Sequence, residues 1–168
     1  MATTTAPATL VTRVATPEDI DEIMELAIEA SAENGFLNPD PVRLLQGIWP
    51  ALHQDHGIMG VVGPEGGKIE GVVLLHVSEH WYSADAFLEE KSIFVRQGAR
   101  GAKDGRAAKL VDFSKRVADT LGLPLLIGVL SNARTAGKVR LYQRAFGEPA
   151  GAFFLYGAAT GQHSGTEH

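Results

Sequence analysis

The residues best suited to chemistry lie in a glycine- and base-rich stretch over 95–107, where a strand pattern ends and a helix pattern begins. Between Lys91 and Arg106 the chain carries five bases and one acid. The first N–H groups of a helix have no partner within it, and together with the helix dipole they attract anions. Three glycines would let the backbone approach such a ligand: Gly98, Gly101 and Gly105. The stretch therefore predicts a phosphate or pyrophosphate site, with a flexible basic surface loop as the alternative.

The known glycine-rich nucleotide motifs do not match this stretch. No Gly-Lys-Ser/Thr ends the loop, and the chain holds no Gly-x-Gly-x-x-Gly. A metal site is not expected either, because the histidines of 53–56, His76 and His80 are loosely spaced without an evident third ligand. Trp81 and Tyr82, close to Glu79 and Asp85, could line a pocket for an amine or simply pack on a sheet.

The elements that must position these residues follow from hydrophobic spacing and turn residues. Apolar positions at helical spacing indicate helices after Thr16, after Asp40, over 105–121 and over 134–146. We expect the second helix to bury Val42, Leu45, Ile48 and Trp49 before Pro50 disturbs it. The expected strands are 10–15, 58–62, 68–77, 88–95, a buried strand over 124–130 and a last strand over 151–156. The predicted order is β-α-α-β-β-β-loop-α-β-α-β.

Composition limits the class of protein. The 168 residues carry a net charge of −5, divided between −12 over residues 1–90 and +7 over 91–168, so a generally basic nucleic-acid binder is excluded. There is no cysteine, which excludes disulfides and thiolate sites. We expect one domain over 10–157 between flexible tails at 1–9 and 158–168. No segment looks like a secretory signal or a membrane span, so a cytoplasmic location is expected.

The glycine-rich stretch resembles the phosphate loop of the GCN5-related N-acetyltransferases, Arg/Gln-x-x-Gly-x-Gly/Ala. The matching residues are Arg100-Gly101-Ala102-Lys103-Asp104-Gly105, with Lys103 where the family has glycine, and Arg100 lies five residues after Val95. The start, Arg13–Asp19, and Leu141-Tyr142 in the last helix are similar to the family as well. Thr135 stands where that helix usually has asparagine. The run 130–154 resembles short phage and prophage members.

This resemblance implies an α/β domain with a mixed sheet, the acyl-CoA N-acyltransferase fold, in which the fourth and fifth strands splay apart around acetyl-CoA. Its pantetheine would pair with the backbone at Phe94 and Val95. Its pyrophosphate would bind the loop and helix start formed by Arg100, Gly101, Ala102, Lys103, Gly105, Arg106 and Ala107. An amine would attack the thioester directly in a ternary complex, so that catalysis rests on positioning and proton transfer.

The resemblance also implies the catalytic candidates. Tyr142 is similar in placement to the tyrosine that hydrogen-bonds or protonates the departing thiolate; its alternative is a core tyrosine. Glu89 and Glu90 are similar in position to the glutamate that serves as base in some members. Because neighbouring strand residues face opposite sides, only one can point into the gap. Glu89 shares its parity with Ile93 and Val95, and Glu90 with Phe94, and both stay candidates.

The expected partners are a small-molecule or protein amine, without nucleic acid or membrane, and the resemblance allows a homodimer. A basic cluster on the last helix could meet the 3′-phosphate of the coenzyme, although we favour a solvated face: Arg134, Lys138, Arg140 and Arg144. The alternative to an enzyme is a catalytically inactive module of the same fold that acts by binding another protein. Lys103 at the usual glycine position favours that alternative.

Overall fold

One five-stranded sheet forms the middle of the computed structural model, which describes residues 8–101, 105–131 and 134–157. The strands lie side by side in chain order, and each of the first four pairs antiparallel with the next. The fifth strand runs parallel to the fourth. The strands are β1 (Leu10–Val14), β2 (Gly57–Pro64), β3 (Gly71–Glu79), β4 (Ala86–Val95) and β5 (Leu125–Leu126).

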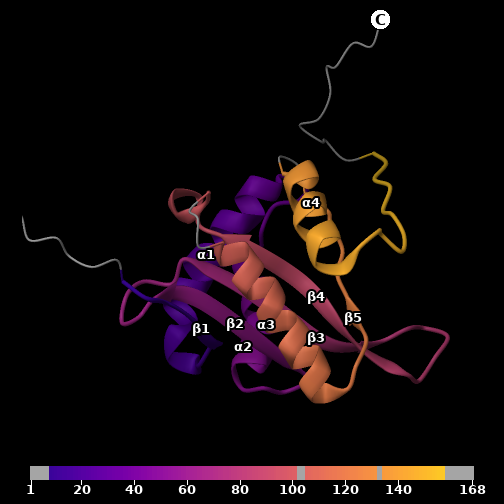
Figure 1. Cartoon of the computed structure of the whole chain (residues 1–168), viewed down its shortest axis with the longest axis horizontal. Coiled ribbons are helices and arrows are strands. Elements are labelled where there is room, and N and C mark those ends of the chain that lie inside the picture. Colours follow the sequence, from indigo (N-terminus) through magenta and orange to yellow (C-terminus); the bar gives the residue numbers. More distant parts are fainter. Residues whose placement is uncertain (1–7, 102–104, 132–133, 158–168) are drawn as a thin grey trace, which may run out of the picture.

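Two helices cover each face of this sheet (Figure 1). They are α1 (Ile20–Asn34), α2 (Pro41–Leu52), α3 (Arg106–Leu121) and α4 (Thr135–Phe146). Alternate strand residues supply the two cores: Val61 and Val72 pack with α1 and α2, whereas Val62 and Val73 pack with α3 and α4. The predicted mixed α/β architecture is therefore confirmed. Within the described residues no helix combines the length and apolar character that a membrane crossing requires.

The start of α1 shows how local sequence fixes an element. The Asp19 carboxylate accepts a hydrogen bond from the Thr16 backbone N–H at 2.8 Å and two from the Arg13 guanidinium, at 2.7 and 2.8 Å. These bonds, above all those from Arg13, hold the pKa of Asp19 below its usual value. Strand β1 is thereby tied to the helix that follows it, and Gly35 ends that helix in the left-handed conformation.

The close packing of α3 on the sheet depends on a glycine in β2. A Cβ atom at Gly60 would lie 2.5 Å from the ring of Phe113, which is buried on α3. Glycine at this position therefore lets the aromatic ring rest directly on the strand backbone.

The second helix does not bury the residues that its spacing predicted. Ile48 is buried, but Val42, Leu45 and Trp49 are 63%, 41% and 44% exposed, because no described element covers that side of α2. The helix also continues past Pro50 and ends at Leu52. Burial of Ala51 and Leu52 against the sheet offsets the hydrogen bond that the proline removes.

The predictions for the last two strands were wrong in extent. The expected buried strand over 124–130 pairs only at Leu125 and Leu126, because β5 has a partner only along the first part of β4. The expected strand over 151–156 is absent from the described structure, and its Phe154 is 96% exposed. The ring of Phe153 in this segment would lie 2.9 Å from a Cβ at Gly128, just beyond the end of β5. An extended segment without a strand beside it has no partner for its backbone N–H and C=O groups and forms no ladder.

Candidate active site at the parting of two strands

The candidate site begins where β4 and β5 separate. Their pairing comprises Leu88 with Leu125 and Glu89 with Leu126, after which β4 continues to Val95 without β5 beside it. The chain returns to this opening as α4, which buries Tyr142 in the same core as Ile93 and Val95. The opening thus brings the second half of β4 next to α4, as the predicted splay of the fourth and fifth strands requires.

A β-bulge at Lys91 decides which glutamate faces this opening. In the ladder with β3, Ser92 pairs with Leu74 and Glu90 with Leu75, so that Lys91 has no partner. One extra residue reverses the alternation of side chains along a strand. As a result Glu90, rather than Glu89, faces the α3–α4 side together with Ile93 and Val95. The parity that the sequence indicated for the two glutamates was therefore wrong.

Glu90 and Tyr142 form a largely buried pair at this point. The Tyr142 hydroxyl donates a hydrogen bond to the Glu90 carboxylate at 3.3 Å. Burial raises the pKa of Glu90 to about 7, against the opposing effects of Lys138 and of the Tyr142 hydrogen bond. Burial and the same carboxylate raise the pKa of Tyr142. A carboxyl group that titrates near neutral pH is suited to accept a proton and release it again.

Glu89 is committed to other contacts. Its carboxylate accepts hydrogen bonds from Lys91 Nζ at 2.6 Å and from Ser78 Oγ at 2.8 Å. Burial alone would raise its pKa, but these bonds hold the pKa of Glu89 below its usual value. Of the two predicted base candidates, the structure therefore places Glu90 beside Tyr142 and keeps Glu89 as an ion-paired carboxylate.

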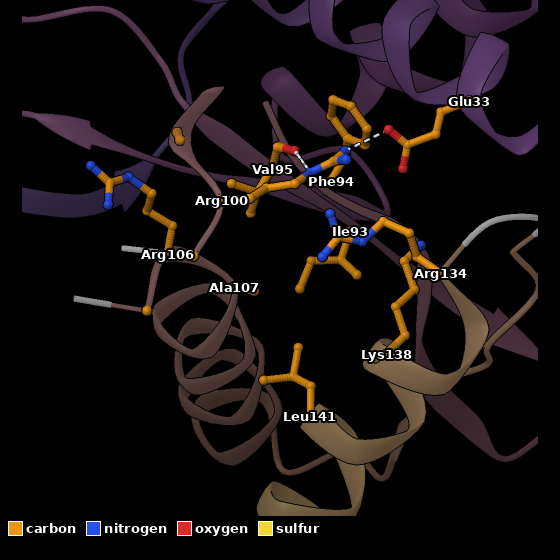
Figure 2. Close-up of a pocket in the computed structure, with 14 residues that line it drawn as sticks. Glu33, Ile93, Phe94, Val95, Arg100, Arg106, Ala107, Arg134, Lys138 and Leu141 are labelled. Carbon is orange, nitrogen blue, oxygen red and sulfur yellow. Dashed lines mark hydrogen bonds and ion pairs between the residues drawn. The ribbon is translucent and has the colours of Figure 1, made fainter. Parts of the chain in front are cut away.

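A pocket of about 220 Å³ opens between the end of β4, the loop that follows it and the N-terminal ends of α3 and α4 (Figure 2). Seven of the nine residues predicted to bind the coenzyme line it: Phe94, Val95, Arg100, Gly101, Gly105, Arg106 and Ala107. The other two, Ala102 and Lys103, lie outside the described residues. Glu90 and Tyr142 do not line the pocket, but Leu141 and Lys138 do, and they stand one position and one helical turn before Tyr142.

Arg100 lines this pocket and is held in place by three contacts. Its Nε donates to the Val95 carbonyl at 2.7 Å, its guanidinium pairs with Glu33 of α1 at 2.7 Å, and it lies 5.0 Å from the centre of the Phe94 ring (Figure 2). Arg106 is held in the same way by Glu70, at 2.5 Å. Both predicted phosphate-binding arginines are thus already paired with a carboxylate.

The start of α3 nevertheless fits an anionic ligand. Gly101 and Gly105 adopt left-handed backbone conformations, with φ of 76° and 56°, which only glycine takes without strain. None of the described side chains caps the helix, and its first N–H groups have no partner within the helix, so they suit a ligand. Nη1 of Arg106 is also buried with no hydrogen-bond partner among the described residues. These donors suit the pyrophosphate of a coenzyme A thioester.

Three charged lining residues were not predicted as site residues. Glu33 could not be foreseen, since its partner Arg100 lies far along the chain. Arg134 and Lys138 belong to the basic cluster that we assigned to a solvated face; they line the pocket, whereas Arg140 and Arg144 do not. Their spacing from Tyr142, one and two turns of α4, was the signal that could have identified them.

The remaining candidates lie elsewhere. Trp81 and Tyr82 are 94% and 68% exposed and do not line the pocket. They gather with His80, whose ring stacks on Tyr82 at 4.9 Å. In the part of the chain that the structure describes, no three histidines or acids come together as metal ligands.

No family model matches this sequence, and a search of curated proteins finds no match. Solved structures do match it over nearly the whole chain. One is AAC(6')-Iy in complex with the bisubstrate analog CoA-S-monomethyl-acetylneamine, at 16% identity and a TM-score of 0.68, with 89% of this chain and 97% of that one covered.

Two further structures are similar to the same extent. A possible acetyltransferase from Clostridium difficile 630 has 17% identity and a TM-score of 0.66, covering 88% of this chain and 97% of that one. An integron cassette protein from the mobile metagenome of Cole Harbour Salt Marsh has 23% identity and a TM-score of 0.67, covering 93% and 91%. The chain thus has the fold of the GCN5-related N-acetyltransferases, the fold predicted from its sequence.

Proposed function

We propose that this protein is a GCN5-related N-acetyltransferase, which transfers the acetyl group of acetyl-CoA to a primary amine by direct attack in a ternary complex. One observation carries the proposal: the predicted coenzyme-binding residues of β4 and α3 surround one pocket, next to a buried Glu90–Tyr142 pair. The similar structure that contains a bisubstrate analog of coenzyme A supports the choice of donor.

In this proposal the start of α3 holds the pyrophosphate together with Ala102 and Lys103, which lie outside the described residues. Arg134 and Lys138 add positive charge from the start of α4. Phe94 and Val95 offer strand backbone to the pantetheine, since β5 does not pair with this part of β4. Glu90 accepts the proton of the attacking amine. Tyr142 donates a hydrogen bond to the departing thiolate. Because its pKa is raised, this role suits Tyr142 better than full transfer of its proton.

Binding of the donor can be tested apart from catalysis. Calorimetry with acetyl-CoA should show micromolar affinity for the wild type and at least tenfold weaker binding for Arg134→Glu, about 1.4 kcal/mol or more. Arg140→Glu is the matched control, because Arg140 is exposed on the same helix and does not line the pocket. The proposal fails if the wild type does not bind acetyl-CoA at millimolar concentration.

Catalysis is then tested by thiol release with a panel of primary amines. The panel includes aminoglycosides, because several of the similar structures are described as aminoglycoside acetyltransferases. Glu90→Gln should remove thiol release and leave acetyl-CoA binding unchanged, since its side chain does not line the pocket.

A second candidate is a catalytically inactive module that keeps the coenzyme pocket and acts by binding a partner protein. The observation that favours it is the withdrawn position of Glu90 and Tyr142, neither of which lines the pocket in this structure. The two candidates differ in one result: the module binds acetyl-CoA but releases no thiol with any amine.

A further inference from the structure

Three acids near the pocket are paired with bases in the described part of the chain, and a fourth, Glu90, is not. Glu33 pairs with Arg100, Glu70 with Arg106 and Glu89 with Lys91, at 2.7, 2.5 and 2.6 Å. Glu90 has a hydrogen bond from Tyr142 but no base within ion-pair distance among the described residues. A carboxylate taken out of water without a positive charge nearby is costly, so the surroundings of Glu90 must either supply charge or keep it protonated.

Lys138 is placed to supply that charge. It lies one turn before Tyr142 on α4, so both side chains point from the same face of the helix toward β4. Lys138 is itself partly buried on the pocket wall (Figure 2) and forms no ion pair within the described chain. Its charge lowers the pKa of Glu90, and Glu90 in turn opposes the lowering of the Lys138 pKa by burial.

We propose that Lys138 is a positioning residue for Glu90: from the pocket wall it keeps the neighbouring carboxylate charged and able to accept a proton. The proposal rests on the proposed acetyl transfer and adds a residue to it. Lys138 takes no part in the bond changes. The proton of the amine passes to Glu90, and Lys138 determines at which pH Glu90 is free to take it.

The charges that face this pair come from several elements, and each enters the expected pH response. Glu33 of α1 favours the charged form of Lys138, but Glu33 is itself paired with Arg100. Arg100 and Arg134 both disfavour the charged form of Lys138, while Glu89 disfavours the charged form of Glu90. The groups whose charge or hydrogen bond acts on Glu90 or Lys138 are Glu33, Glu89, Arg100, Arg134 and Tyr142, of which Glu89 lies on the other face of β4.

The direct test is to titrate the Glu90 carboxyl by NMR in protein labelled at the glutamate side-chain carboxyl carbons, with Glu90→Gln to assign the signal. In Lys138→Met the titration midpoint should rise by about one pH unit, as expected for the loss of a nearby opposite charge. Lys138→Arg, which keeps the charge, should restore the wild-type midpoint. Lys68→Met removes an exposed lysine from the β2–β3 turn and should change nothing.

The pH profile of thiol release gives the second readout. The pKa of Glu90 is about 7 in the wild type, so about half of the Glu90 carboxyl is ionised at pH 7. A midpoint one pH unit higher leaves about a tenth of the carboxyl ionised at that pH. In Lys138→Met, kcat should therefore fall about fivefold at pH 7 and recover above about pH 9. Circular dichroism confirms that each variant is folded.

Two results would overturn the proposal. One is an unchanged Glu90 midpoint in folded Lys138→Met. The other is a rise in KM for acetyl-CoA with an unshifted profile, which would make Lys138 only a ligand contact. If the midpoint moves as expected but no variant, the wild type included, releases thiol, then Lys138 does control the charge of Glu90 and the proposed acetyl transfer is refuted instead.

Discussion

Replacing Glu90 by glutamine should stabilise the protein in alkaline solution and leave its stability unchanged in acid. The carboxyl is held in a largely buried place, where its pKa is raised from 4.5 to about 7. Glutamine has the same shape as the protonated acid and can still accept the Tyr142 hydrogen bond. The substitution therefore removes only the cost of keeping a charge at this position.

The size of the effect follows from the difference in pKa. Each pH unit between the folded and unfolded pKa values corresponds to about 1.4 kcal/mol, so a shift from 4.5 to about 7 amounts to about 3 kcal/mol. The folded state binds the proton more tightly than the unfolded state, so the wild type loses stability as the pH rises through this interval. The gain from Glu90→Gln is thus absent below pH 4.5 and complete above about pH 8.

Urea unfolding at pH 4.5, 7 and 9, followed by circular dichroism, measures this difference directly. For a chain of this length about 3 kcal/mol corresponds to a rise in melting temperature of roughly 6–12 °C. Glu65→Gln, at an exposed carboxyl of the β2–β3 turn, is the control and should have no effect at any of these pH values. Equal stability of Glu90→Gln and wild type at pH 9 would refute the raised pKa and the role of burial in it.

Three other predictions test the packing and the site. Gly60→Ala should destabilise the fold by about 2 kcal/mol in urea unfolding, because its Cβ would overlap the Phe113 ring; adding Phe113→Leu should recover part of this loss. Asp19→Asn should cost about 1 kcal/mol at pH 7, and the cost should disappear as the pH falls and the wild-type carboxyl loses its charged bond to Arg13. Tyr142→Phe should raise the NMR titration midpoint of its carboxylate partner, because the hydroxyl donor favours the charged form; an unchanged midpoint would contradict the hydrogen bond.

The strands and helices around the glycine-rich loop could be predicted because local signals agree there. Gly122 ends α3, and the capping residues at 16–19 start α1, as expected from their types. Seven coenzyme-binding candidates surround one pocket because they are close in sequence, on one strand end and the helix start that follows it. Their predicted role in binding stays a prediction.

The misassigned features depend on contacts that a single sequence does not display. The buried face of α2 is decided by what the sheet covers, so Trp49 and Ile48 looked equally suitable for the core. The strand over 151–156 had strand-like residues, but only a neighbouring strand could have completed it. The orientation of Glu90 depended on the bulge, which requires knowledge of the pairing of β4 with β3.

That bulge also divides β4 into two segments with separate side-chain frames. Leu88 and Glu90 follow one frame, Ile93 and Val95 follow another, and Lys91 is the surplus residue between them. Deleting Lys91 would leave a regular ladder in which all the remaining residues of β4 keep their present face of the sheet. Lys91 is therefore a place in β4 where the chain can be shortened by one residue without exchanging the two cores.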